Sequence, residues 1–249
     1  GGVTLPSFRG HIVNDDAFTA EARVPDPERL LRAYHQSAST LNLLRSLTRG
    51  GFSDLNRVHA WTQSFVDATP QGRQYKDLAD EIGRALRFMG ACGVDTASLP
   101  TLHQTDFYTS HEALLLPYEE ALTRVDPLTG ERFATSAHMI WIGERTRRID
   151  GAHVAYFASV ANPIGCKVGP TATPDEVLGL CEALNPDRIP GRLTLISRMG
   201  AGRIEEGLRP LLAAVRDAGH PVVWACDPMH GNTFTSESGH KTRRFDDIL

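Results

Sequence analysis

The chain has 249 residues, of which 41% are hydrophobic and 22% charged, and its formal net charge is −4. These values are ordinary for a globular protein with a substantial core, and the negative charge argues against a general nucleic-acid-binding surface. Because no apolar stretch approaches the roughly 18 residues that a membrane-spanning helix needs, we expect no membrane partner.

The amino-terminal part begins irregularly and then becomes helical. Residues 1–26 contain scattered Gly, Pro, Asp and Asn with little periodicity. Asp26 and Pro27 have the character of an N-cap and a first helical residue. Apolar residues then recur at steps of three and four, which predicts an amphipathic helix over 28–47 that ends before Gly50.

Two more helices are predicted in this part, over 54–67 and 75–92, the second closed by Gly93. Three successive helices are not expected in a fold of alternating strands and helices. We therefore interpret 27–93 as an inserted helical block packed on the domain that follows, with a role in subunit contact or regulation. The simpler alternative is that the block only covers apolar surface.

Residues 94–249 show alternating strand and helix patterns. A strand is predicted over 106–112, a helix or helical turn over 113–124 and a β-turn at 127–130. Four apolar strands that each end in a polar turn follow, at 139–145, 164–170, 193–200 and 222–230. The steps from Trp141 to Lys167, Arg198 and His230 are 26, 31 and 32 residues, the length of a strand, a helix and two loops.

This repetition predicts βα units of a (β/α)8 TIM barrel, with five strand candidates in all. Two helix boundaries support the pattern. Thr173 and Glu176 have the spacing of a capping box, and Gly219 has the place of a helix-ending glycine. A barrel of this kind builds its active site at the carboxyl ends of its strands.

Charged residues occupy those strand ends. Arg145 offers a planar fork for phosphate or carboxylate, although Glu144 and Arg145 could equally form a structural ion pair. Lys167, flanked by glycines that let a ligand approach, could form a Schiff base, hold an anion, or simply reach the surface.

The last two strand ends add to this chemistry. Arg198 precedes glycines at 200 and 202, whose backbone could bind an anion at a helix start. His230 could ligate a metal or move protons, although a lone histidine usually does neither. We interpret the segment 241–244 as a solvated loop, although it could bind a second phosphate group. Together these residues predict a phosphorylated substrate beside a metal.

Several separated motifs, in order, resemble class II (plant-type) 3-deoxy-D-arabino-heptulosonate 7-phosphate (DAHP) synthases over essentially the whole chain. They are 110–114, 141–147, 167–170, 197–200, 227–233 and 241–243. The resemblance implies a TIM barrel, of which this chain holds about strands three to seven. It also implies condensation of phosphoenolpyruvate with erythrose 4-phosphate and release of phosphate, the first step of the shikimate pathway and of aromatic amino acid biosynthesis.

The resemblance also implies roles for individual residues. Arg145, Lys167 and Arg198 would hold the phosphate and carboxylate of phosphoenolpyruvate, so that Lys167 would clamp an anion. Glu144 would shape that pocket and orient the attacking water, and His230 would ligate a divalent metal, manganese or cobalt. The remaining matches are Glu112 and Trp141, which would line the pocket, and Lys241, at the erythrose 4-phosphate end.

The chain departs from the family in its metal ligands. The family uses Cys, His, Glu and Asp, and only His230 matches here. The other three, with one more phosphoenolpyruvate-binding arginine, would belong to strands outside this sequence. We therefore expect a central segment with feeble activity on its own. Cys166 and Cys226 are expected to be core thiols rather than metal ligands.

Other functions fit the same motifs. The chain could belong to a secondary-metabolite enzyme that makes DAHP or its amino analogue, or to a non-catalytic regulatory subunit that binds phosphate. The four cysteines form no CxxC pair and follow no secretory signal, which favours reduced thiols in the cytoplasm. The resemblance further implies a homo-oligomer, while nothing in the sequence identifies a feedback effector.

Overall fold

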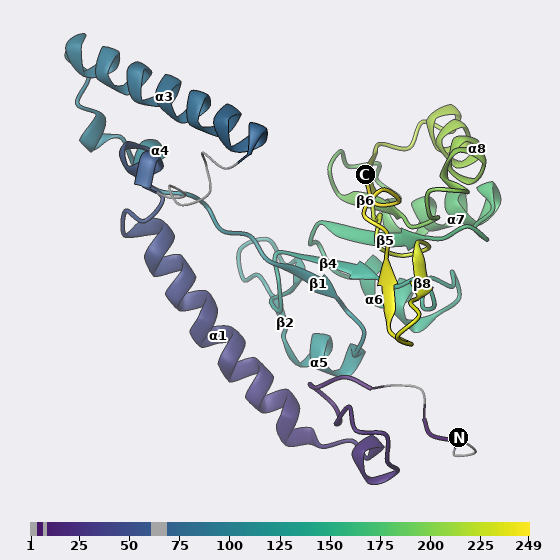
Figure 1. Ribbon diagram of the computed structural model, residues 1–249. Coiled ribbons are helices and arrows are strands. Elements are labelled where there is room, and N and C mark those ends of the chain that lie inside the picture. The colour runs from purple at the N-terminus through teal and green to yellow at the C-terminus, as the bar shows by residue number, and fades with distance from the viewer. Residues whose placement is uncertain (1–3, 7–8, 61–68) are drawn as a thin grey trace. The chain divides into compact units, whose positions relative to one another are not determined.

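A computed structural model describes residues 4–6, 9–60 and 69–249 (Figure 1). The chain divides into two compact units, residues 1–107 and 108–249, and each is treated by itself. Residues 1–26 thus group with the helices that follow them. The sequence pattern placed the start of the βα domain at residue 94. The boundary between the two units lies later, between residues 107 and 108.

The first unit is helical. Its elements are η1 (Glu21–Arg23), α1 (Pro27–Arg49), η2 (Leu55–Ala60), α3 (Pro70–Ala91), η3 (Thr96–Ser98) and α4 (Pro100–His103). The Asp26 carboxylate accepts a hydrogen bond from the Glu28 N–H at 3.0 Å, which confirms the predicted N-cap of α1.

Two helix predictions in this unit need correction. α3 begins at Pro70 rather than at 75, because the Thr69 side chain caps it and Pro70 occupies its first turn. The helix predicted over 54–67 is a 3₁₀ helix from Leu55 to Ala60, and its remaining residues lie outside those that the structure describes.

The second unit is built on a parallel sheet. Its strands are β1 (Ser110–Glu112), β4 (Met139–Ile142), β5 (Ile164–Val168), β6 (Leu193–Ser197) and β7 (Val222–Cys226), in the order β1-β4-β5-β6-β7. The helices are α5 (Leu116–Ala121), α6 (Ala152–Ala158), α7 (Pro174–Leu184) and α8 (Ile204–Asp217). The five predicted strands are confirmed, although β1 is shorter than the 106–112 prediction. No closed barrel is present among the described residues.

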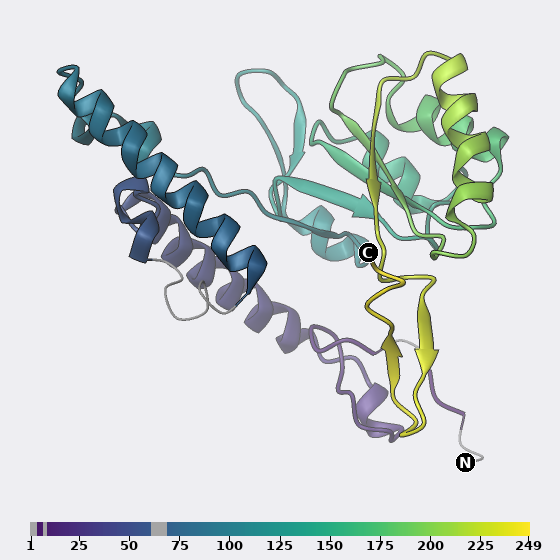
Figure 2. The same cartoon turned by 45° about the horizontal axis from the view of Figure 1, so that its top comes forward.

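Two antiparallel hairpins accompany the sheet. The first joins β2 (Thr123–Val125) to β3 (Arg132–Ala134) around the predicted turn at 127–130. The second joins β8 (Thr233–Thr235) to β9 (Lys241–Arg243), and Figure 2 shows it in yellow, extending away from the sheet. The prediction of a loop at 241–244 is therefore wrong. β-branched and aromatic residues favour a strand at 233–235, and 241–243 pairs with it.

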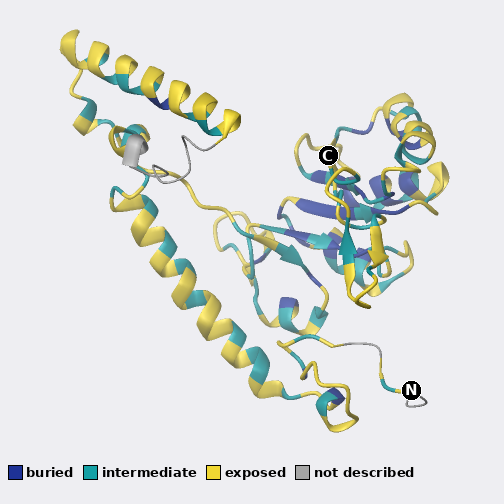
Figure 3. Ribbon diagram, viewed as in Figure 1, coloured by how far each residue is buried: buried dark blue, intermediate teal, exposed yellow. Residues whose placement is uncertain are grey.

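The two faces of the sheet differ in burial. Ile140, Ile142, Cys166 and Leu195 point to one face and are fully buried in a core shared with α6, α7 and α8 (Figure 3). The alternate residues, such as Trp141, Lys167 and Ile196, point to the opposite face and are only partly buried. The side chains at issue for function lie on this second, more open face and at its carboxyl edge.

Both predicted helix boundaries in this unit are confirmed. The Thr173 hydroxyl accepts from the Glu176 N–H, and the Glu176 carboxylate accepts in return from the Thr173 N–H at 3.0 Å, which completes the capping box of α7. Gly219, just after α8, has φ of 71°, a conformation that glycine adopts without strain.

Candidate functional site

Lys167 is the centre of a charged cluster at the carboxyl edge of the sheet. Its Nζ lies 3.5 Å from Glu112 Oε2 and 3.7 Å from Asp227 Oδ2, and its side chain is 12% exposed. Glu112 ends β1 and Asp227 follows β7, each two strands away from β5 in the sheet order. The two outer strands therefore direct carboxylates inward onto one central ammonium group.

Asp227 also forms hydrogen bonds with His230. Its Oδ2 lies 2.6 Å from His230 Nδ1, and its Oδ1 accepts from the N–H groups of Met229 and His230 at 3.1 and 3.2 Å. Burial raises the pKa of Asp227, but the hydrogen bonds from His230 and the charges of His230 and Lys167 outweigh this and lower it. In the neutral tautomer whose Nδ1 donates to the carboxylate, His230 Nε2 presents a lone pair, the arrangement typical of a metal-ligating histidine.

The turn after β4 pairs different residues from those expected. Glu144 Oε1 accepts from Arg147 Nε at 3.2 Å, so the structural pair is Glu144 with Arg147. Arg145 is exposed, and its guanidinium makes no ion pair or side-chain hydrogen bond with any residue that the structure describes. Arg145 is therefore free to bind an anion, whereas the alternative of a Glu144–Arg145 ion pair is wrong.

Two glycines make room for the carboxylates of the site. A Cβ at Gly169 would lie 2.6 Å from Glu144 Oε1, and a Cβ at Gly143 would collide with the Glu112 carboxylate. The sequence interpretation, that glycine near Lys167 lets a ligand approach, thus needs revision for Gly169. Its missing side chain accommodates Glu144.

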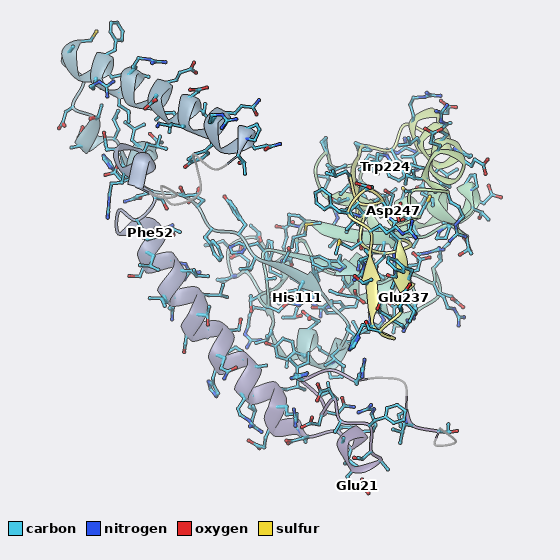
Figure 4. All side chains as sticks on the ribbon, viewed as in Figure 1. Glu21, Phe52, His111, Trp224, Glu237 and Asp247 are labelled. Carbon is cyan, nitrogen blue, oxygen red and sulfur yellow. The ribbon has the colours of Figure 1, made fainter. Side chains whose placement is uncertain are left out.

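The loops after β6 and β7 contact each other. The backbones of Gly200 and Gly231 touch, and both have positive φ. Asn232 Oδ1 accepts from the Ala201 N–H at 2.8 Å, and Asn232 Nδ2 donates to the carbonyl of Asp247, which is labelled in Figure 4. The backbone before α8 was expected to bind an anion, but its Ala201 N–H is already engaged by Asn232.

The other predicted site residues are placed as follows. Arg198 follows β6 directly and is partly buried, and its guanidinium has no partner among the described side chains and carbonyls. Trp141 lies on the open face with its Nε1 buried and without a hydrogen bond in the described part of the chain. Lys241 is exposed in β9 and makes no ion pair with the Lys167 cluster.

The donor set for a metal is incomplete. Among residues 4–6, 9–60 and 69–249, no group of three or more His, Cys, Asp or Glu side chains is arranged to hold a metal ion. Burial raises the pKa of Cys166 to about 12, so that its thiol stays protonated at neutral pH and is a core thiol, as predicted. Cys226 is exposed, which contradicts the prediction that it is buried in the core.

Sequence reasoning assigned no role to Asp227 and Arg147. Asp227 follows β7 in the same way that Arg198 follows β6, so its position was a usable signal. Arg147 lies three residues after Glu144, a spacing that brings side chains together in a helical turn.

Comparisons with known proteins identify the family of this chain. A profile of the class-II DAHP synthetase family matches residues 1–249. The chain belongs to the class-II DAHP synthetase family. It is 56% identical over 248 residues to phospho-2-dehydro-3-deoxyheptonate aldolase of Streptomyces coelicolor, covering 100% of this chain and 54% of that protein.

A second relative in this family is phospho-2-dehydro-3-deoxyheptonate aldolase AroG of Mycolicibacterium smegmatis. It is 47% identical over 250 residues, which cover 98% of this chain and 53% of that protein. This member of the DAHP synthetase family thus spans about half the length of the curated relatives that it matches. Within its described residues, no helix is both long and apolar enough to cross a membrane.

Proposed function

We propose that this chain carries the phosphoenolpyruvate-binding part of a 3-deoxy-7-phosphoheptulonate synthase. The reaction condenses phosphoenolpyruvate with erythrose 4-phosphate and releases phosphate, at the start of the shikimate pathway. The observation that carries the proposal is the set of cations at one edge of the sheet. Lys167 is held there between two carboxylates, while the guanidinium groups of Arg145 and Arg198 have no partner among the residues that the structure describes.

The three cations have distinct roles in this proposal. The guanidinium groups of Arg145 and Arg198 bind the phosphate and carboxylate of phosphoenolpyruvate, because their planar forks match those anions. Lys167 supplies a fixed point charge. Its Nζ is engaged by Glu112 and Asp227, which favours an anion clamp over a Schiff-base nucleophile.

The protein groups position the reactants. With both phosphates neutralised, C3 of phosphoenolpyruvate can approach the aldehyde carbon of erythrose 4-phosphate, and water then adds at C2. Glu144 orients that water through Oε2, which is buried and has no hydrogen-bond partner among the described residues. Glu112 and Trp141 line the pocket, and Lys241 contacts the erythrose 4-phosphate end.

His230 is the proposed metal-binding residue. Its Nε2 would be one ligand of a divalent manganese or cobalt ion, whose chemistry is polarisation of the aldehyde carbonyl. Asp227 would fix the ring so that this nitrogen faces the ion. The described residues do not complete such a site, so His230 alone is assigned.

The wider architecture is also part of the proposal. A sheet of five parallel strands with helices on one face supports membership of a (β/α)8 barrel. The described cysteines are all free thiols, which agrees with a cytoplasmic enzyme. A homo-oligomer is proposed from the family resemblance.

The test is phosphate release from the two substrates with manganese, together with the mass of the product. For the 249-residue chain we expect phosphoenolpyruvate binding with slow turnover to DAHP, because only one metal ligand is assigned. Turnover equal to that of a full-length class II enzyme would contradict this incomplete metal site. Formation of amino-DAHP when imino-erythrose 4-phosphate replaces erythrose 4-phosphate would favour the secondary-metabolite alternative. Binding without any metal-dependent turnover would favour a regulatory subunit.

A further inference from the structure

We infer that Arg147 is a positioning residue that holds the Glu144 carboxylate in place and neutralises its charge beside bound phosphoenolpyruvate. This inference rests on the proposed function and adds to it a residue that contacts no substrate. It follows from the way in which Glu144 is enclosed, and from the different environments of the two arginines in the turn at 145 and 147.

Glu144 is fixed from two sides. Arg147 Nε donates to its Oε1 at 3.2 Å, and the backbone at Gly169 lies against the same carboxylate, where a Cβ would be 2.6 Å from Oε1. The side chains of Arg147 and Glu144 are only 12% and 20% exposed. Among the described residues Oε1 is engaged by Arg147 and the buried Oε2 has no hydrogen-bond partner, so the clamp leaves one defined oxygen for a further hydrogen bond.

Arg147 is itself anchored to a helix start. Its Nη1 lies 3.6 Å from Glu176 Oε2, and this same oxygen accepts from the Thr173 N–H in the capping box of α7. The hydrogen bond from Thr173 and, less strongly, the charge of Arg147 lower the pKa of Glu176. The turn after β4 is therefore connected to the first turn of α7, which restricts the directions that Arg147 can take.

The two arginines of this turn, Arg145 and Arg147, differ in exposure and in their charged partners. Arg145 is exposed and has no charged partner in the described part of the chain, so its charge is available to a ligand. Arg147 pairs with Glu144 through Nε and with Glu176 through Nη1. Without Arg147, the Glu144 carboxylate would carry an uncompensated negative charge, which would repel phosphoenolpyruvate across a poorly screened distance.

A double-mutant cycle on phosphoenolpyruvate binding tests this inference. Calorimetry would compare the wild-type chain with Arg147→Met, Glu144→Gln and the double variant. We expect Arg147→Met to weaken binding about tenfold in the wild-type background. In the Glu144→Gln background the same change should weaken binding less than about threefold, since no charge then needs neutralising. Arg147→Lys should restore most of the affinity.

Arg148 provides the matched control, because it lies in the same turn and pairs with Asp150 in an exposed ion pair. Arg148→Met should change binding by less than about twofold. Thermal unfolding would establish that each variant folds, and Arg147→Gln would replace Arg147→Met in the cycle if the latter did not.

The outcomes separate this inference from the function on which it rests. A wild-type chain that does not bind phosphoenolpyruvate would overturn the proposed function and the inference with it. Binding by the wild type, with equal effects of the Arg147 change in both backgrounds, would overturn only the inference, because Arg147 would then act independently of Glu144.

Discussion

Lys167 Nζ lies 3.7 Å from Asp227 Oδ2, although β6 stands between the strands that carry these two residues. The same oxygen of Asp227 contacts His230 Nδ1 at 2.6 Å. One carboxylate thus links a proposed substrate-binding cation to the proposed metal ligand. This link makes the geometry of the two proposed subsites interdependent.

Asp227→Asn should therefore weaken metal binding. The amide can donate to Nδ1 as well as accept from it, so the ring would no longer be held with Nε2 free. We expect manganese affinity to fall about 10- to 100-fold, measured by calorimetry or by the paramagnetic resonance of free manganese. Asp217→Asn is the control, because Asp217 is exposed and pairs only with its neighbour Arg216 among the residues described. Unchanged affinity in Asp227→Asn would show that Asp227 does not orient His230.

Gly169→Ala should disturb Glu144 without unfolding the sheet. The new methyl group would lie 2.6 Å from the Glu144 carboxylate, which would have to move away from Arg147. We expect phosphoenolpyruvate binding to weaken about five- to tenfold with a small loss of stability. Gly202→Ala is a suitable comparison, since a Cβ there would meet no described atom within 4 Å. If both variants bind equally well, the contact between Gly169 and Glu144 has no part in binding.

Arg192 should be important for stability rather than for binding. Its guanidinium donates to the carbonyls of Val160, Asn162 and Leu184 at 2.7, 3.0 and 3.1 Å, and so ties the loop before β5 and the end of α7 to the start of β6. Arg192→Met would leave these carbonyls without their donor, and we expect a loss of about 3 kcal/mol in urea unfolding. The exposed Arg209, replaced by Met, should cost less than about 0.5 kcal/mol, and a similar small cost at Arg192 would refute its structural role.

Glu176 should give the second unit a specific pH dependence. Its pKa is held below the ordinary value chiefly by the Thr173 N–H. A carboxylate with a lowered pKa stabilises the fold fully above its unfolded pKa of about 4.3, and this contribution is lost as the pH falls through the folded pKa. The melting temperature of Glu176→Gln should therefore lie below that of the wild type at about pH 7 and approach it near pH 3. A difference that stays constant with pH would contradict this account.

The elements of the fold were predictable from the sequence, because their signals are local. The apolar runs indicated five strands, and Thr173 with Glu176 indicated the start of α7. The hairpin β8–β9 was missed because each of its strands is only three residues long, and their pairing with each other, rather than burial, forms them.

The contacts of the site were less predictable, because they depend on the direction of each side chain. Glu144 and Arg145 are adjacent in a turn and point different ways, so the partner of Glu144 is Arg147. The contact between Asp227 and Lys167 depends on the pairing of β5, β6 and β7. Glu112 and Lys167 lie on the same face of the sheet because of the register that β1 and β5 have with β4. A shift of one residue in either strand would have turned those side chains into the core.

The central claim is that the carboxyl edge of the sheet binds phosphoenolpyruvate through Lys167, Arg145 and Arg198. Calorimetric titration of phosphoenolpyruvate into the wild-type chain, Lys167→Met and Arg198→Met tests it most directly, with Arg209→Met as the control. We predict saturable binding by the wild type and the control, and a loss of at least about tenfold in each site variant. Equal affinity in all four proteins, or no binding by the folded wild-type chain, would contradict the claim.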